Sequence, residues 1–126
     1  MKINYELWQI QPETDCPFVY MGLEWLRKMG YEPVPVWYER VDASVFETNA
    51  LVPEPLTYAL ESIYSHYNPP VRPSEIGMPL RSMSVSDVVA IHHGGVVSVW
   101  YCDPVGFKRI AGLGWDEATG LKGEKV

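Results

Sequence analysis

The pattern of a β-hairpin in the second half of the chain constrains its fold most. Two apolar runs, Val88–His93 and Val96–Cys102, are separated by a Gly-Gly pair. Paired glycines supply the positive φ angles that a two-residue turn between antiparallel strands requires. Because such a turn sets the pairing of the two strands, we expect His93 to lie opposite Val96. The sequence therefore predicts an antiparallel sheet that includes this hairpin.

Hydrophobic periodicity and chain breakers predict the other elements. Residues 5–10 alternate with period two, which is typical of a strand. In residues 53–67 apolar side chains recur at helical spacing, and the Asn-Pro-Pro that follows ends the helix. A second helix is expected over residues 20–29, where a glycine follows the last turn. Two further short strands are expected over residues 34–38, at a sheet edge because of a proline, and over residues 107–110.

Together these elements predict an α+β fold. Its centre is an antiparallel sheet of about four strands with two helices packed on one face and a C-terminal β-hairpin. The chain has 126 residues, the size of one domain of ~100–150 residues. We expect this domain to span residues 1–115, with a proline-rich surface loop over residues 69–79. Residues 116–126 lack periodicity and are expected to form a flexible polar tail.

The charge and the composition disfavour several classes of function. The formal net charge is −6, and an acidic surface repels phosphate, so direct binding of nucleic acid is not expected. No stretch approaches the roughly 20 apolar residues that span a bilayer, and the first residues show no signal-peptide core. Cys16 and Cys102 lie far apart, which favours reduced thiols over a disulfide framework. We therefore expect a cytoplasmic protein that does not bind membranes.

The sequence motifs of common catalytic and metal sites are absent. Adjacent residues of a strand point to opposite faces, so His92 and His93 cannot clasp one metal ion together. The hairpin register puts Cys102 opposite Asp87, which would raise the pKa of the thiol and so disfavour an activated nucleophile. The chain has no nucleophile elbow and no phosphate-binding glycine loop. We therefore expect no enzyme, no metal and no cofactor.

Residues 82–89, Ser-Met-Ser-Val-Ser-Asp-Val-Val, are dense in small hydroxyl groups directly before the hairpin. Ser84 and Asp87 fit a capping pattern, in which side chains fold onto nearby backbone N–H groups. One interpretation is that the segment builds the tight start of the hairpin. The other is a polar recognition rim beside exposed aromatic side chains. We favour the first, because Ser and Asp beside a strand usually serve turn geometry.

Residues 82–89 and 100–107 resemble the YodL-like domain family. The family patterns are approximately S-L-S-V-S-D-V-V and Y-Y-C-D-S-x-G-F, and the departures are Met83, Trp100 and Pro104. The similarity extends upstream over residues 5–9, 20–24 and 60–68. It implies a small cytoplasmic protein of phages, plasmids and conjugative elements of Gram-positive and gut bacteria. It implies no particular reaction.

Small proteins in that genetic setting often counter host defence. We therefore expect a non-enzymatic protein-binding module that modulates or inhibits a host defence protein, of the anti-CRISPR or antirestriction type. The 5 Trp and 8 Tyr fit this expectation, because both residues are enriched at binding hot spots. We expect Trp25 and Trp115 to be exposed, and Trp8, Trp37 and Trp100 to lie in the core. The candidate binding residues are Ser82, Ser84, Ser86, Asp87, Tyr101, Asp103, Phe107, Trp25 and Trp115.

Two other functions are considered beside it. Ser84, Ser86, Asp87 and Asp103, at the base of the hairpin, would form the site of a small enzyme of unknown reaction if a pocket gathered them. The edge strand expected over residues 34–38 would let two copies pair, which predicts a self-associating accessory domain and a homo-oligomer. For the binding module, the acidic charge favours a basic nucleic-acid-processing host protein as the partner.

Overall fold

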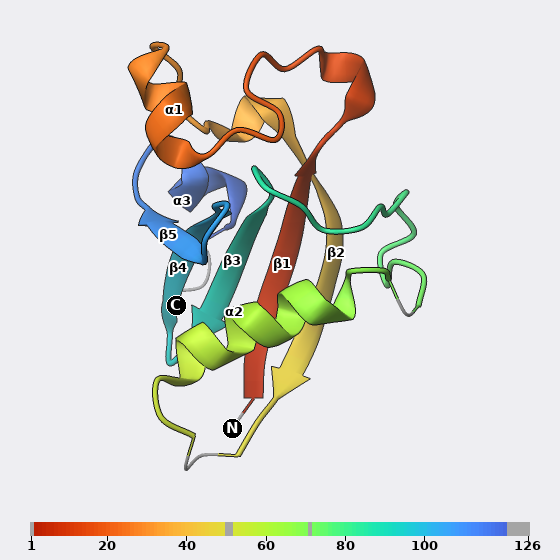
Figure 1. The fold of residues 1–126 in the computed structure, drawn as a ribbon. Coiled ribbons are helices and arrows are strands. Elements are labelled where there is room, and N and C mark those ends of the chain that lie inside the picture. Colours follow the sequence, from red (N-terminus) through yellow and green to blue (C-terminus); the bar gives the residue numbers. More distant parts are fainter. Residues whose placement is uncertain (1, 50–51, 71, 121–126) are drawn as a thin grey trace.

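The structure, a computed structural model, describes residues 2–49, 52–70 and 72–120 and confirms the α+β fold (Figure 1). The strands are β1 (Lys2–Ile10), β2 (Tyr38–Glu47), β3 (Val88–His93), β4 (Val96–Cys102) and β5 (Phe107–Ile110). The helices are α1 (Leu23–Lys28), α2 (Pro55–His66) and α3 (Trp115–Ala118), with short 3₁₀ helices at Pro12–Thr14 and Pro35–Trp37. The sheet order is β2-β1-β3-β4-β5, and all neighbouring strands are antiparallel.

The hairpin of β3 and β4 has the predicted register. His93 pairs with Val96 across the turn. The two turn glycines have φ angles of 60° and 76°, which glycine adopts without steric cost. Just beyond the ladder, the N–H of Cys102 donates to the carbonyl oxygen of Asp87 at 2.8 Å, so these residues lie opposite each other as expected. The predictions of β1, α1, α2 and β5 are confirmed as well, although α1 is shorter than predicted.

The prediction of a strand over residues 34–38 is wrong. Pro35–Trp37 forms a 3₁₀ helix, which the fixed φ of a proline at its first position favours. The edge strand is β2, which lies in a weakly patterned stretch of sequence. Val41 and Asp42 are both buried although they are adjacent, and the pairing with β1 shifts once along the strand. This bulge breaks the alternation by which strands are predicted, which is why the pattern does not reveal β2. With β2, the sheet has five strands rather than about four.

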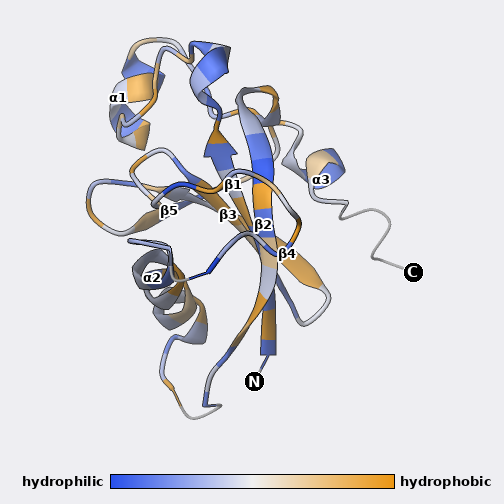
Figure 2. Ribbon diagram, turned by 90° about the vertical axis from the view of Figure 1, so that its right-hand side faces the viewer, coloured by the Kyte–Doolittle hydropathy of each residue, from blue (hydrophilic) through white to orange (hydrophobic). Residues whose placement is uncertain are grey.

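The two faces of the sheet are covered by different helices, as Figure 2 shows for α2 and α3. Val89 of β3 packs in one core cluster with Leu60 of α2. The next residue of β3, Ala90, packs in the opposite cluster with Leu26 of α1 and Trp115 of α3. Consecutive strand residues point to opposite faces, and both residues of β3 are fully buried, so each face needs its own cover. The expectation of two helices on one face is therefore wrong.

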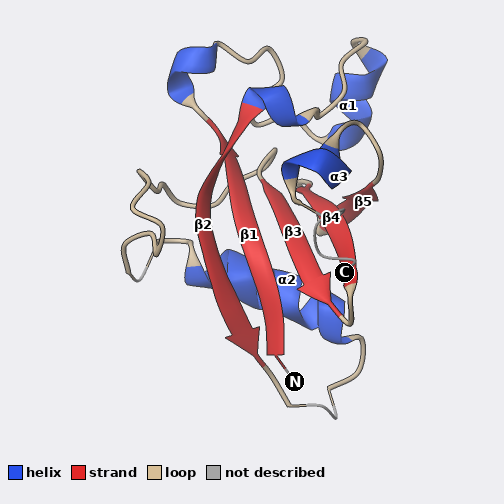
Figure 3. Cartoon of the chain, turned by 180° about the vertical axis from the view of Figure 1, so that it is seen from behind, coloured by secondary structure: helices blue, strands red, loops and turns tan. Residues whose placement is uncertain are grey.

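Helix α3 lies in front of the sheet in Figure 3, on the face opposite α2, and brings Trp115 into the core. The side chain of Trp115 is 0% exposed, and its indole N–H donates to the carbonyl oxygen of Pro33 at 2.8 Å. The ring packs edge-on against Trp8 and Tyr38, with centroid distances of 5.3 and 5.4 Å. The prediction that Trp115 is exposed is wrong. Without its ring, the aromatic side chains of Trp8 and Tyr38 on this face of the sheet would be left in contact with water.

The segment predicted to be a polar tail begins as a helix. Residues 116–118 continue α3, and the Thr119 hydroxyl donates to the carbonyl oxygen of Trp115 at 2.7 Å. Ordered chain therefore extends past residue 115, where we expected the domain to end. The rest of the predicted tail, residues 121–126, lies outside the described residues.

Candidate functional site

A fully buried carboxylate, Asp87, lies at the start of the hairpin. Its Oδ2 accepts hydrogen bonds from Gln9 Nε2 at 3.1 Å and from the N–H of Ser84 at 2.9 Å. Arg81 forms an ion pair with it, with 2.9 Å between Nη2 and Oδ1 and 3.4 Å between Nη1 and Oδ2. The bond from Ser84 is the local backbone contact expected from the capping pattern. The cluster ties the end of β1 to the segment before β3.

Burial controls the acidity of Asp87. Removal from water raises the pKa of this carboxyl from 3.8 to about 6, and Arg81, Ser84 and Gln9 act in the opposite direction. A carboxyl with a raised pKa suits general acid–base chemistry. Here, however, the carboxylate oxygens are taken up by internal donors and the side chain is 0% exposed. The arrangement suits a structural tie better than contact with a substrate.

Ser86 connects the hairpin to the segment before α1. Its hydroxyl oxygen accepts the N–H of Tyr20 at 3.0 Å, and its carbonyl oxygen accepts the hydroxyl of Tyr38 at 2.7 Å. The φ angles of Ser86 and Tyr20 are 84° and 66°, in the left-handed region that residues other than glycine rarely adopt. Two strained residues are thus joined by one hydrogen bond.

Tyr101, near the end of β4, and Asp103, directly after β4, hold the same segment. The Tyr101 hydroxyl donates to the carbonyl oxygen of Met21 at 2.6 Å. Asp103 Oδ1 accepts the N–H of Leu23, the first residue of α1, at 2.8 Å. A carboxylate at this position satisfies a free N–H of the first helical turn and complements the helix dipole. Ser86, Tyr101 and Asp103 therefore all bind the backbone of residues 20–23, at the start of α1.

Gly22 allows this close approach. A Cβ atom at this position would lie 3.0 Å from Cδ of Pro104 and 3.3 Å from Oδ1 of Asp103. A larger residue would therefore push the segment away from the turn that follows β4. Gly22 thus has a steric role at this turn.

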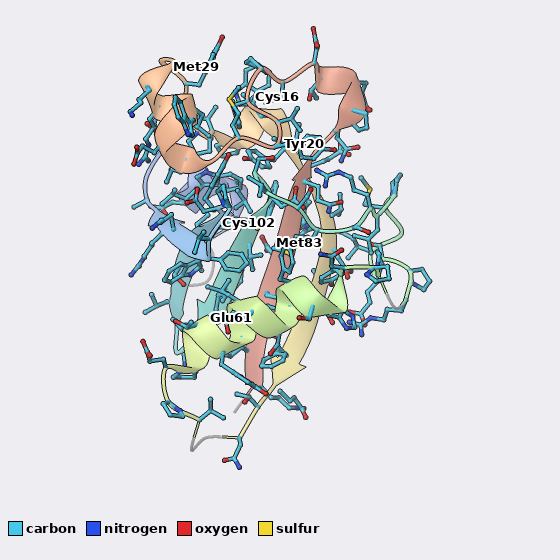
Figure 4. All side chains as sticks on the ribbon, in the orientation of Figure 1. Cys16, Tyr20, Met29, Glu61, Met83 and Cys102 are labelled. Atoms are coloured by element: carbon cyan, nitrogen blue, oxygen red, sulfur yellow. The ribbon has the colours of Figure 1, made fainter. Side chains whose placement is uncertain are left out.

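The segment that these side chains hold presents apolar groups to solvent. We define residues 20–29 as the α1 segment. Tyr20 is 62% exposed, Trp25 64% and Met29 56%. Figure 4 shows Tyr20 and Met29 at the α1 end of the molecule. Trp25 and Met29 lie four residues apart, on one side of the helix, and Lys28 Nζ lies 5.0 Å from the centre of the Trp25 ring. The predicted exposure of Trp25 is confirmed.

A hollow of about 620 Å³ adjoins the α1 segment beside β5. Its lining residues are Leu23, Glu24, Arg27, Lys28, Asp103 and Lys108. Two of the cations are paired, Arg27 with Glu32 at 2.9 Å and Lys28 with Glu24 at 3.4 Å. Acidic and basic side chains therefore lie together beside the α1 segment, as they do in the polar rim of a protein interface.

The model of one known family, the YodL-like domain, matches residues 4–112. The chain belongs to the YodL-like domain family. The matched part contains both motifs, the α1 segment and all five strands except the first two residues of β1. Helix α3 lies after the matched part. No curated protein and no solved structure matches the chain. The resemblance stated from the two motifs is thus confirmed.

The motifs of this YodL-like domain are largely internal. Among the candidate binding residues, the buried ones are Ser86, Asp87, Tyr101 and Trp115. The half-buried ones are Ser84, Asp103 and Phe107, and the exposed ones are Ser82 and Trp25. Six of the nine come together around the α1 segment. Trp25 belongs to it, and Ser86, Tyr101 and Asp103 bind its backbone. Ser84 and Asp87, which are hydrogen-bonded to each other, lie next to Ser86 in the chain or close to it. Phe107 instead packs on the α2 side of the sheet. The tryptophans expected in the core, Trp8, Trp37 and Trp100, are half-buried.

Both cysteines of the YodL-like domain are free and buried. Burial, with the negative charges of Asp87 and Asp103, raises the pKa of the Cys102 thiol to about 12. Burial also raises the pKa of the Cys16 thiol. Both thiols therefore stay protonated at neutral pH, and neither is an activated nucleophile.

Sequence reasoning missed a second buried polar cluster, which lies under α2 in the YodL-like domain. The Tyr67 hydroxyl donates to the Asp42 carboxylate and lies 2.8 Å from the Tyr5 hydroxyl. Asp42 Oδ1 also accepts the N–H of Glu75 at 2.8 Å. Burial raises the pKa of both tyrosines, so they stay neutral. The sequence signal for this cluster is that Tyr5 and Tyr67 both fall on apolar faces, because the hydroxyl of a buried Tyr usually needs a hydrogen-bond partner.

A further hollow, of about 650 Å³, lies where β1 and β4 begin, and Glu6 and His92 are among its lining residues. Glu6 Oε1 accepts the indole N–H of Trp8 at 3.0 Å, and its Oε2 lies 3.5 Å from Arg40 Nη1 and 3.4 Å from His92 Nε2. Within the described part of the chain, no three His, Cys, Asp or Glu side chains are placed to hold a metal ion. Among the same residues, no helix is long and apolar enough to cross a bilayer.

Proposed function

We propose that this YodL-like domain is a non-enzymatic protein-binding module and that the exposed side of the α1 segment is its contact surface. One observation carries the proposal. Side chains of both motifs bind the backbone of residues 20–23, while the same segment directs Tyr20, Trp25 and Met29 into solvent. The motifs therefore support the surface from beneath, and the surface itself consists of residues that a core would normally absorb.

The physical chemistry of these side chains favours an interface. Burying the apolar area of an exposed Trp on a partner contributes about 25 cal/mol per Å². Trp and Tyr are also the residues most enriched among binding hot spots. Because hydrogen bonds already hold the segment in place, it loses little conformational entropy on binding.

The partner that we propose is a host defence protein, which the domain modulates or inhibits in the cytoplasm in the manner of anti-CRISPR or antirestriction proteins. Two observations support this part. The family resemblance implies the setting of a mobile element, and the net charge of −6 would steer the domain towards a basic nucleic-acid-processing protein. Attraction of this kind weakens as salt is added.

The proposal is tested by affinity capture of the tagged full chain from host lysate, at low and at high salt, with Trp25→Ala as the test variant. We expect the variant to recover roughly tenfold less partner than the wild type, because a central Trp of an interface is a hot spot. Its free energy of unfolding should change by less than about 0.5 kcal/mol, since the side chain is 64% exposed. The wild-type yield should fall at high salt.

Tyr58→Ala is the matched control. This aromatic side chain is 46% exposed, but it lies on α2, outside the α1 segment. It should recover as much partner as the wild type. Equal recovery by all three proteins would contradict the proposed surface, and recovery of no specific protein by the wild type would contradict the binding function.

The alternative of a small enzyme at the base of the hairpin receives less support. It needs Ser84, Ser86, Asp87 and Asp103 to face a shared pocket. Asp87 and Ser86 are 0% exposed, and Asp103 caps α1. The alternative of self-association through residues 34–38 loses its edge strand, because Pro35–Trp37 forms a 3₁₀ helix.

A further inference from the structure

Arg81 links the buried carboxylate to the exposed α1 segment. On one side its guanidinium pairs with Asp87 at 2.9 Å. On the other side its Cζ lies 6.0 Å from the centre of the Tyr20 ring, within the range of a cation–π contact. Asp87 also neighbours Ser86, whose hydroxyl accepts the N–H of Tyr20. One ionisable group is therefore connected to the α1 segment both through a side chain and through the backbone.

We propose that the Asp87–Arg81 pair is a proton-operated latch on the α1 segment. When Asp87 takes up a proton from solvent, the ion pair is lost, and the guanidinium leaves the Tyr20 ring for water. Arg81 can make this move because 30% of its side chain is already exposed. The hydrogen bond of Ser84 to the carboxyl then weakens, and residues 20–23 become less firmly held.

The charged group that contacts Asp87 is the guanidinium of Arg81. The other titratable groups near the carboxyl are Tyr38 of β2 and Tyr101 and Cys102 of β4. Burial raises the pKa of each of these three groups, so they are neutral throughout the acidic and neutral range. The pKa of Asp87 itself is raised to about 6 by burial, against the effect of Arg81, which puts its titration within a mild pH range.

The sign of the effect on stability follows from linkage. The pKa of Asp87 is about 6 in the folded chain against a reference value of 3.8, so the folded state binds the proton more tightly. The contribution of this group is therefore fully present below about pH 4 and is lost as the pH rises to about 6. Relative to Asp87→Asn, the folding equilibrium constant of the wild type should fall by roughly a hundredfold over this interval. The carboxylate is thus held at a cost, which its protonation relieves.

The latch is tested without any partner, by following backbone amide signals of the ¹⁵N-labelled full chain from pH 7.5 to pH 5. The amides of Ser84, which donates to Asp87, and of Tyr20, which donates to Ser86, are the reporters. In the wild type both should move with one midpoint near pH 6. In Asp87→Asn this transition should be absent.

Arg81→Gln provides the second variant, which keeps the carboxyl. Without the guanidinium the midpoint of Ser84 should shift to higher pH, and the response of Tyr20 should shrink to the part that passes through Ser86. The latch is overturned if Asp87→Asn retains the common transition. It is also overturned if the Tyr20 amide signal does not move while the Ser84 signal titrates, because protonation of Asp87 then has no effect on the α1 segment. A consequence for partner binding rests on the proposed function, whereas these results do not depend on it.

Discussion

Replacing Asp87 with alanine is expected to lower the free energy of unfolding by about 3 kcal/mol at neutral pH. The change removes the acceptor of Gln9 Nε2, of the N–H of Ser84 and of the Arg81 guanidinium in one step. Donors left without a partner in a buried site carry their full desolvation cost. We place the loss at the lower end for a broken buried ion pair, because Arg81 is 30% exposed and can turn towards water.

Chemical denaturation at pH 7 measures this loss. Asp116→Ala is the control, since it removes an exposed acidic side chain from the first turn of α3. The control should change the free energy of unfolding by no more than about 0.5 kcal/mol. A loss below about 1 kcal/mol for Asp87→Ala would show that the cluster around Asp87 does not stabilise the fold.

Trp115→Ala is expected to cost about 4 kcal/mol, the largest effect of a single truncation that we predict. The ring is 0% exposed, packs against Trp8 and Tyr38, and donates to the carbonyl oxygen of Pro33. Alanine would leave a cavity on the face of the sheet opposite α2 and would orphan that carbonyl oxygen.

Trp25→Ala is the natural comparison, because the same residue type is truncated at an exposed site. Denaturation of both variants should give losses that differ by about 3 kcal/mol or more. The near-ultraviolet circular dichroism of Trp115→Ala should also change more, since its indole lies among aromatic rings. Similar losses for the two variants would contradict the assignment of Trp115 to the core.

The elements predicted correctly have signals that are local in sequence. The Gly-Gly pair sets the hairpin register, and the helical spacing of residues 56–67 depends only on neighbouring turns. Over its predicted part the strand β1 alternates between the two faces of the sheet, because Tyr5 and Leu7 pack in the cluster with α2 and Ile10 packs in the opposite cluster. In each case one stretch of sequence contains all the information that the element needs.

The errors concern features that depend on distant parts of the chain. β2 is a strand because β1 pairs with it, and its bulge hides the alternation. Trp115 follows the last strand, where exposure is the usual expectation, yet its indole N–H bonds to Pro33, 82 residues earlier. Which helix covers which face likewise depends on packing rather than on local pattern.

The candidate site shows the same division. Both motifs were identified from the sequence, but their targets were not. Ser86 binds Tyr20 across 66 residues, and Tyr101 and Asp103 bind Met21 and Leu23 across 80. Those targets are backbone atoms, which carry no sequence signal of their own. A motif of Ser, Asp and Tyr therefore resembled a binding rim, whereas the structure makes it the support of the segment that bears Trp25.

Amide hydrogen exchange tests this supporting role most directly. In Ser86→Ala the amide of Tyr20 should exchange roughly tenfold faster than in the wild type, and in Asp103→Ala the amide of Leu23 should do so. The amide of Ile63 in the buried face of α2 should keep its rate in both variants. Unchanged rates for Tyr20 and Leu23, or an equal increase at Ile63, would contradict the claim that the motifs hold the α1 segment.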